Sequence, residues 1–241
     1  MWFCSMSHSL TSRAMRNLVV HRATRKIAVL VGTSVLAALP AVASAVPIVD
    51  SAGDFLPTYT GPHDPGLDVL AHRVTLSGDR LTLFGEMAGP VGATQAVGGL
   101  YLFGVDRGQG TPRFLNSPAS PPSIGPNVLW DAIVRVNANG TGAYVNSLAG
   151  VTTTLDPLDI TISGNTLSVS VPLSLMLTSA IRPPQDWTYN LWPRNGVGLN
   201  VQVSDLAPDN GNSAVQVIPE PASVALCAIG VFGMLRRGRK R

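Results

Sequence analysis

The sequence predicts an all-β protein, a single antiparallel β-sandwich of jelly-roll or immunoglobulin-like type. A signal helix is expected before the sandwich and a short hydrophobic helix after it. Glycine and proline supply 24 and 19 of the 241 residues, which favours short strands joined by turns. Apolar residues recur at every second position in several central segments, and longer apolar runs lie near the two ends.

The N-terminal residues have the three parts of an export signal. Basic residues occur within 13–26, the apolar run Ile27–Leu39 follows, and small residues stand at Ala43 and Ala45. A basic start, a short apolar core and an A-x-A site together predict a signal peptide that signal peptidase removes. The apolar run is too short for a permanent membrane span. A start at Met15, and a buried helix of the fold in place of a signal, are the alternatives.

The central residues form a series of expected strands. Val69–Leu76 and Leu81–Met87 are joined by the turn sequence Ser77-Gly78-Asp79, and every second residue from Leu81 is expected on one face. One short helix is expected at Pro172–Leu177. The further strands expected are Gly99–Val105, Trp130–Val136, Thr141–Leu148, Leu158–Ile162, Leu167–Val171, Trp187–Leu191 and Leu199–Val203.

The C-terminus combines a short motif, an apolar run and a basic cluster. Pro219, Glu220 and Pro221 precede the 14-residue run Ala222–Leu235, and arginines follow it, beginning with Arg236 and Arg237. This order resembles the PEP-CTERM sorting signal. The resemblance implies recognition and cleavage by an exosortase-type membrane enzyme. As a helix the run is roughly 21 Å long, against a hydrocarbon core of about 30 Å, so a plain membrane anchor is the alternative.

The charge of the chain is divided between its ends and its middle. Five basic residues precede Val46 and five follow Leu235, whereas the residues between carry seven basic and all 14 acidic side chains, about −7. The basic pI therefore indicates no nucleic-acid partner. We expect a signal peptide at 1–45, an extracellular domain at 46–218 and a sorting signal at 219–241. Both cysteines lie in the tails, so the domain has no disulfide or thiolate nucleophile.

Aspartates at the start of the domain form a candidate calcium site. Asp50, Asp54 and Asp68 lie early, and Asp205 and Asp209 lie near the end of the domain. The first and last strands of a sandwich are often neighbours, and calcium binds six to eight oxygens. The alternative is that these aspartates cap turns. No other cofactor is expected, and the sequence contains no G-x-S-x-G, H-E-x-x-H, P-loop or G-x-G-x-x-G motif.

Four aromatic side chains, Trp130, Trp187, Tyr189 and Trp192, are candidates for stacking on sugar rings, above all Trp187 and Trp192. Alternation places Trp187 on one face with Tyr189, and Trp192 on the opposite face. Core packing is the alternative for all four. The segments Asp50–Asp54 and Tyr189–Arg194, with Leu67-Asp68-Val69, give the middle a loose resemblance to DOMON and related carbohydrate-binding sandwiches. That resemblance implies a binding domain for sugar or haem.

These features predict an exported, non-catalytic protein of the cell surface or extracellular space, held transiently at the inner membrane. Its expected partners are signal peptidase, an exosortase-type enzyme, the membrane and exopolysaccharide or biofilm matrix. A carbohydrate-binding module that recognises extracellular glycan is the second hypothesis. A secreted hydrolase of unfamiliar type is the third. In the second hypothesis, exposed tryptophan or tyrosine side chains recognise the glycan, and glycan binding by the purified domain would distinguish it from the first.

Overall fold

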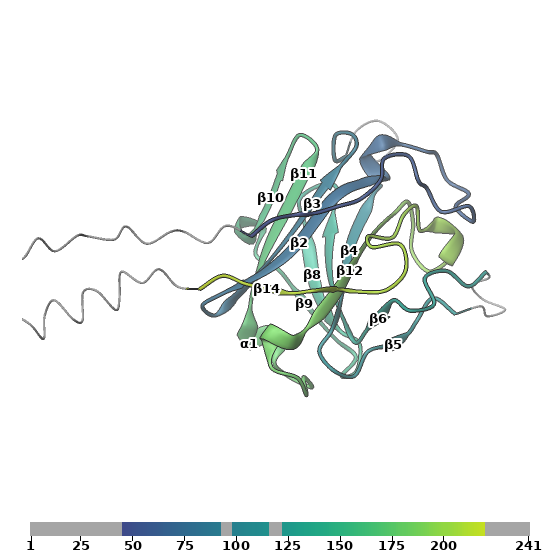
Figure 1. Cartoon of the computed structure of the whole chain (residues 1–241). Helices are drawn as coiled ribbons and strands as arrows, with labels where there is room; N and C mark the ends of the chain where they lie inside the picture. Colours follow the sequence, from purple (N-terminus) through teal and green to yellow (C-terminus); the bar gives the residue numbers. More distant parts are fainter. Residues whose placement is uncertain (1–44, 93–97, 116–121, 220–241) are drawn as a thin grey trace, which may run out of the picture. The chain divides into compact units, whose positions relative to one another are not determined.

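The computed structural model describes residues 45–92, 98–115 and 122–219 (Figure 1). These residues form strands in antiparallel sheets with almost no helix, which confirms the all-β prediction. The expected signal and C-terminal helices lie outside the described residues, as do Ala43, Glu220, Pro221, Arg236 and Arg237. Ala45 and Pro219 are the terminal described residues. Within the described ranges, no helix is long and apolar enough to cross a membrane.

The first sheet has six strands in the order β1-β2-β3-β11-β10, with β14 added to β2 in parallel. Tight turns containing Gly78 (φ 56°) and Gly164 (φ 58°) join β2 to β3 and β10 to β11, as the turn sequences predict. Its strands are β1 (Ile48–Val49), β2 (Val69–Ser77), β3 (Arg80–Met87), β10 (Ile160–Ser163), β11 (Thr166–Pro172) and β14 (Gln216–Val217).

The second sheet also has six strands, in the order β13-β12-β4-β7-β8-β9. They are β4 (Leu100–Asp106), β7 (Ala132–Asn137), β8 (Gly142–Asn146), β9 (Val151–Thr154), β12 (Thr188–Arg194) and β13 (Ser213–Ala214). A separate pair, β5 (Thr111–Pro112) with β6 (Leu129–Trp130), lies beside this sheet (Figure 1). The helical elements are α1 (Leu173–Met176), within the expected helix, and the 3-10 turns η1 (Pro65–Leu67), η2 (Pro157–Asp159), η3 (Pro184–Asp186) and η4 (Asn200–Gln202).

The inner faces of the two sheets share one hydrophobic core. Every second residue of β3, from Leu81 to Met87, is buried, as the alternation predicts. From the second sheet, Phe103, Val134 and Tyr189 enter the same cluster. A second, smaller cluster lies on the outer face of the second sheet and includes Leu102, Phe114, Val128, Trp192, Val203 and Leu206. The chain therefore has apolar packing on both faces of its second sheet.

Three expected strands differ in the structure. In the strand expected at Leu158–Ile162, Leu158 and Asp159 belong to the turn η2, and β10 begins at Ile160. Leu199–Val203 forms the turn η4 in place of a strand, because the Gln202 side chain accepts a hydrogen bond from the Leu199 backbone N–H at 3.1 Å. Trp130 belongs to β6 and joins the outer cluster, whereas Ala132 begins β7 in the inner core. The intervening Asp131 binds the backbone N–H of Arg107 and interrupts the alternation.

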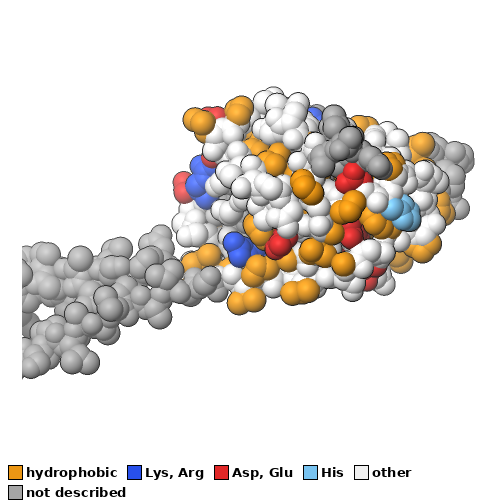
Figure 2. Space-filling model, turned by 90° about the horizontal axis from the view of Figure 1, so that it is seen from above, with side chains coloured by type: hydrophobic (Ala, Val, Ile, Leu, Met, Phe, Trp, Pro, Cys, Tyr) orange, Lys and Arg blue, Asp and Glu red, His pale blue; other side chains and the backbone are white. Residues whose placement is uncertain are grey.

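The first and last described segments meet at the edge of the first sheet. The Gln216 side chain donates a hydrogen bond to the Val46 carbonyl at 2.9 Å. On the face shown in Figure 2, hydrophobic side chains are scattered among acidic ones and form no single continuous patch. Scattered apolar residues of this kind are normal on a protein surface.

Candidate functional site

A pocket of about 320 Å³ lies on the outer face of the second sheet. Leu102, Ile133 and Trp192 point outward from β4, β7 and β12, because their strand neighbours fill the inner core. The segments 113–114 and 197–200 form the remaining walls. We call this the arginine–tryptophan pocket, and it is lined by Leu100, Leu102, Arg113, Phe114, Trp130, Ile133, Arg135, Val145, Trp192, Arg194, Val197, Gly198 and Asn200. Its volume is at the lower end of the range usual for ligand sites.

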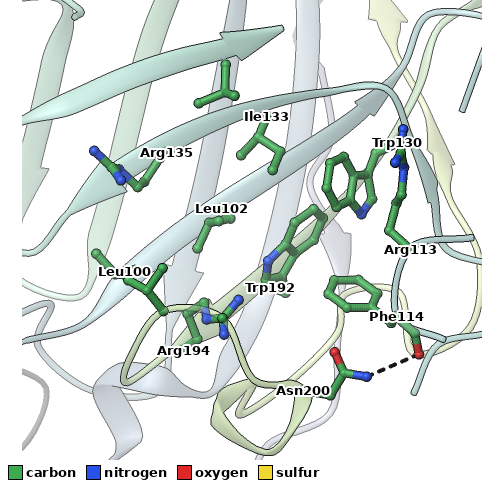
Figure 3. Close-up of a pocket in the computed structure, with 13 residues that line it drawn as sticks. Leu100, Leu102, Arg113, Phe114, Trp130, Ile133, Arg135, Trp192, Arg194 and Asn200 are labelled. Carbon is green, nitrogen blue, oxygen red and sulfur yellow. Dashed lines mark hydrogen bonds between the residues drawn. The ribbon is translucent and has the colours of Figure 1, made fainter. Parts of the chain in front are cut away.

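Three aromatic rings form one wall of this pocket (Figure 3). Phe114 meets Trp192 edge to face, with ring centroids 5.0 Å apart, and Trp130 lies 5.8 Å from Trp192. The Trp192 ring lies directly over Gly104 of the neighbouring strand, where an added Cβ would come within 2.2 Å of the ring. The Asn200 side chain holds the wall by donating to the Phe114 carbonyl at 3.3 Å. The aromatic wall is therefore fixed by its own packing.

Three arginines surround the aromatic wall. Arg113 lies 5.3 Å from the centre of the Trp130 ring, while Arg135 and Arg194 come from β7 and β12 (Figure 3). They are three of the seven basic residues between the tails. The three ion pairs among the described residues all use other arginines, and no carboxylate lines the pocket there. The pocket is thus a positive site in an acidic domain.

Several buried donors at the pocket have no acceptor within the described protein. These are the indole N–H groups of Trp130 and Trp192 and the Nε–H groups of Arg135 and Arg194. Arg194 is only 9% exposed, and burial lowers the pKa of its guanidinium. Its Nη2 donates to the Leu199 carbonyl at 2.8 Å, which fixes the group in place. A buried donor without a partner is costly, so the pocket suits a ligand rich in acceptors.

The structure separates the two tryptophans that the sequence singles out. Trp187 is fully buried in the inner core, and its indole N–H donates to the Arg182 carbonyl at 2.8 Å. Trp187 therefore does not fit the sugar-binding role considered for it, because its ring is packed between the sheets. Trp192 lies on the opposite face, as alternation predicts, and lines the pocket.

Sequence reasoning missed the arginines of the pocket. Arg135 alternates with the buried Val134 and Val136 along β7, so the pattern predicts an ordinary solvent-exposed side chain at this position. Arg113 and Arg194 lie 81 residues apart in the sequence, and only the fold brings them together. The sequence offers a signal for two of them, because Arg113 adjoins Phe114 and Arg194 follows Trp192 by two residues, whereas Arg135 stands between two valines.

The expected calcium ligands come together near the C-terminal end of η1, where Asp68 is the capping residue. Carboxylate oxygens of Asp50, Asp54 and Asp209 lie within 4.8 Å of one another, and those of Asp54, Asp68 and Asp205 do the same. We call these five residues the aspartate cluster. The expected convergence of the two ends of the domain is therefore present in the structure.

A third polar cluster is completely paired. Arg107 and Asp131 are both fully buried, and Arg107 Nε donates to Asp131 Oδ1 at 2.6 Å. Arg107 Nη1 donates to the Tyr144 hydroxyl at 2.7 Å and to the Met176 carbonyl at 2.7 Å. Its Nη2 donates to Asn146 Oδ1 at 3.2 Å. We call this the Arg107 centre, and its contacts join the residue after β4 and the residue before β7 to β8 and α1.

Comparison with known proteins assigns no family to the chain. No protein-family model matches it, and no curated protein matches its sequence. The geometry of the pocket and of the two charged clusters therefore carries the functional assignment.

Proposed function

We propose that this chain is an exported, non-catalytic surface protein whose β-domain binds an acidic glycan in the arginine–tryptophan pocket. The observation that carries the proposal is the set of three arginines without carboxylate partners around a fixed aromatic wall. Guanidinium groups bind carboxylates through paired hydrogen bonds, and aromatic faces pack against the apolar faces of sugar rings.

The acidic character of the domain supports specificity for the pocket. The residues between the tails carry a formal charge of about −7, which disfavours an anionic polymer on the domain as a whole. An acidic glycan is then attracted only where the arginines gather. Trp130 is half-buried and so offers the stacking surface, while Trp192 lines the pocket almost fully buried.

The lining of the pocket favours binding over hydrolysis. Its described residues include no carboxylate, histidine, serine or cysteine. A glycosidase needs two carboxyl groups on either side of the bond that it cleaves. The pocket has donors and aromatic rings in place of such a pair, which is why we propose a carbohydrate-binding module and not an enzyme.

Export and sorting complete the proposal. The signal-peptide pattern ending at Ala45 and the PEP-CTERM-like tail beginning at Pro219 support delivery to the envelope and processing by an exosortase-type enzyme. We further propose that the two sheets form one sandwich of the carbohydrate-binding kind, supported by their shared core. The ligand would then be a uronic-acid polymer of the surrounding exopolysaccharide. The intact mass of the surface-exposed protein tests both cleavages.

Binding of a galacturonic-acid oligomer to the full chain tests the glycan proposal. We expect saturable binding in calorimetry that weakens as salt rises, because the contact is ionic. The same oligomer with methyl-esterified carboxyls should bind poorly. Replacing Arg135 by Gln should weaken binding by about 10–100-fold, since a hydrogen bond to a charged group contributes about 1.5–3 kcal/mol.

A second arginine–aromatic pair provides the matched control. Arg73 lies 4.6 Å from the centre of the Phe84 ring on the first sheet, away from the pocket. Arg73→Ala should leave affinity unchanged, whereas Arg113→Ala and Trp130→Ala should reduce it. Equal binding of the acidic and esterified oligomers, or equal loss in Arg73→Ala and Arg113→Ala, would contradict an acidic-glycan site.

A further inference from the structure

The aspartate cluster concentrates negative charge without a cation beside it. Asp68 is 3% exposed and Asp205 is fully buried, whereas Asp209 is exposed and opens the cluster to solvent. The three ion pairs among the described residues involve none of these five carboxylates. Burial of several carboxylates together is unfavourable unless they are protonated or bind a cation.

Three oxygens of the cluster are buried without a hydrogen-bond donor. They are Asp50 Oδ2, Asp54 Oδ1 and Asp68 Oδ1. The other oxygen of Asp68 accepts from the Gly53 backbone N–H at 2.8 Å, which leaves Oδ1 as the free acceptor of a nearly buried side chain. These free oxygens are an observation separate from the mere grouping of acidic residues, because turn-capping carboxylates use their oxygens on backbone N–H groups.

The surrounding backbone holds the ligands in place from both ends of the domain. Asp205 accepts from the Val69 and Leu206 backbone N–H groups at 2.8 and 2.6 Å. The Asn190 side chain donates to the Pro208 carbonyl at 2.7 Å and so fixes the loop that carries Asp209. A prearranged set of this kind costs little to order when an ion binds.

We propose that the aspartate cluster binds a calcium ion, with Asp54 shared between its two groups of three carboxylates. Oxygens bound to one calcium at about 2.3–2.6 Å lie at most about 5 Å apart, and the observed groups lie within 4.8 Å. The donors are all oxygens, which favours a hard cation, and three carboxylates in each group exceed the one or two that magnesium commonly takes. The ion joins the segment after β1 to the loop before β13.

The pKa values of the clustered carboxyl groups are consistent with a site for a cation. Burial, with a smaller contribution from neighbouring aspartates, raises the pKa of Asp205 to about 8 and that of Asp50 to about 6. Carboxylates that repel one another in this way gain most from a divalent cation.

Calorimetry and thermal melting of the chelator-treated full chain test the proposal. We expect saturable calcium binding, weaker magnesium binding, and a Tm increase of about 5–10 °C when calcium exceeds its Kd about 100-fold. Asp54→Asn should weaken calcium binding at least about tenfold. The same substitution should raise the Tm of the calcium-free protein, because it removes one of several repelling charges.

Asp156→Asn is the matched control, because exposed Asp156 caps η2 outside the cluster and asparagine caps equally well. It should leave calcium affinity unchanged. Absence of binding heat and of a Tm shift at 5 mM calcium would overturn the proposal. Equal affinity for magnesium and calcium, or equal weakening in Asp54→Asn and Asp156→Asn, would overturn it too. Glycan binding by the pocket is measured separately, so the two proposals fail independently.

Discussion

The Arg107 centre and the aspartate cluster both bury charged side chains, but the polar atoms of the centre are hydrogen-bonded within the chain and several of those of the cluster are not. The Arg107 guanidinium donates hydrogen bonds to Asp131, Tyr144, Asn146 and two backbone carbonyls. The aspartate cluster leaves three buried oxygens without a donor. A buried charge whose partners all come from the same chain serves the fold. Buried charges that lack such partners indicate a site for a bound ion or ligand.

The arginine–tryptophan pocket belongs with the aspartate cluster in this comparison. It too leaves polar atoms buried and unpaired, but they are donors, whereas those of the cluster are acceptors. The two sites therefore suit ligands of opposite charge. Three measurements of protein stability test the contrast with the Arg107 centre.

Removing Arg107 should have the largest effect. Arg107→Met leaves the fully buried carboxylate of Asp131 without its cation, and breaking a buried pair in this way costs about 3–5 kcal/mol. Urea unfolding measures the loss. Adding Asp131→Asn to the same chain should recover part of it, since the uncompensated charge disappears. A loss below about 1 kcal/mol for Arg107→Met would show that the centre does not hold the fold.

His72 is an intermediate case, buried with one polar partner. It is 1% exposed, its Nδ1 lies 3.1 Å from the Tyr189 hydroxyl, and burial lowers its pKa from 6.5 to about 4. The unfolded chain therefore binds the proton more tightly, and the stability that neutral His72 contributes is lost as pH falls from 6.5 towards 4. This loss amounts to about 2 kcal/mol between pH 6.5 and 5.

The His72 contribution is isolated by comparing the free energy of unfolding of the wild type and His72→Phe at pH 7 and pH 5. Carboxylates titrate in both proteins, so their effect cancels in the difference. The His72→Phe variant should lose less stability on acidification than the wild type. Parallel pH profiles would place the imidazole in contact with water.

The smallest effect is expected at the surface pair of Arg80 and Asp159. Their side chains are 38% and 29% exposed, and such pairs contribute about 0–1 kcal/mol. Asp159→Asn should therefore change stability by less than about 1 kcal/mol in urea unfolding. It should also lose its effect in high salt. A cost comparable to that of Arg107→Met would mean that burial does not distinguish the two pairs.

The sequence predicted the parts of the fold that depend on local alternation. The β2–β3 and β10–β11 hairpins follow from period-two patterns with glycine at the turns. The break at Asp131 was missed because it depends on hydrogen bonds to the distant Arg107. The sequence also predicts that the five aspartates meet, because they lie near the two ends of the domain and the first and last strands of a sandwich are often neighbours. The pocket was not, because isolated arginines on a strand resemble solvated side chains.

The parallel pairing of β14 with β2 has a mechanical consequence. Two residue pairs, the hydrogen bond from the Ile218 N–H to the Leu76 carbonyl at 2.9 Å, and that from the Gln216 side chain to the Val46 carbonyl hold the last described segment to the edge of the first sheet. Tension applied through the chain beyond Pro219 would peel this segment away before it loads the interior strands. A calcium ion bound in the aspartate cluster would hold Asp209 to Asp50 and Asp54. Detachment of the C-terminal segment would then stop at Asp209, and the ion would limit how far the domain can be stretched.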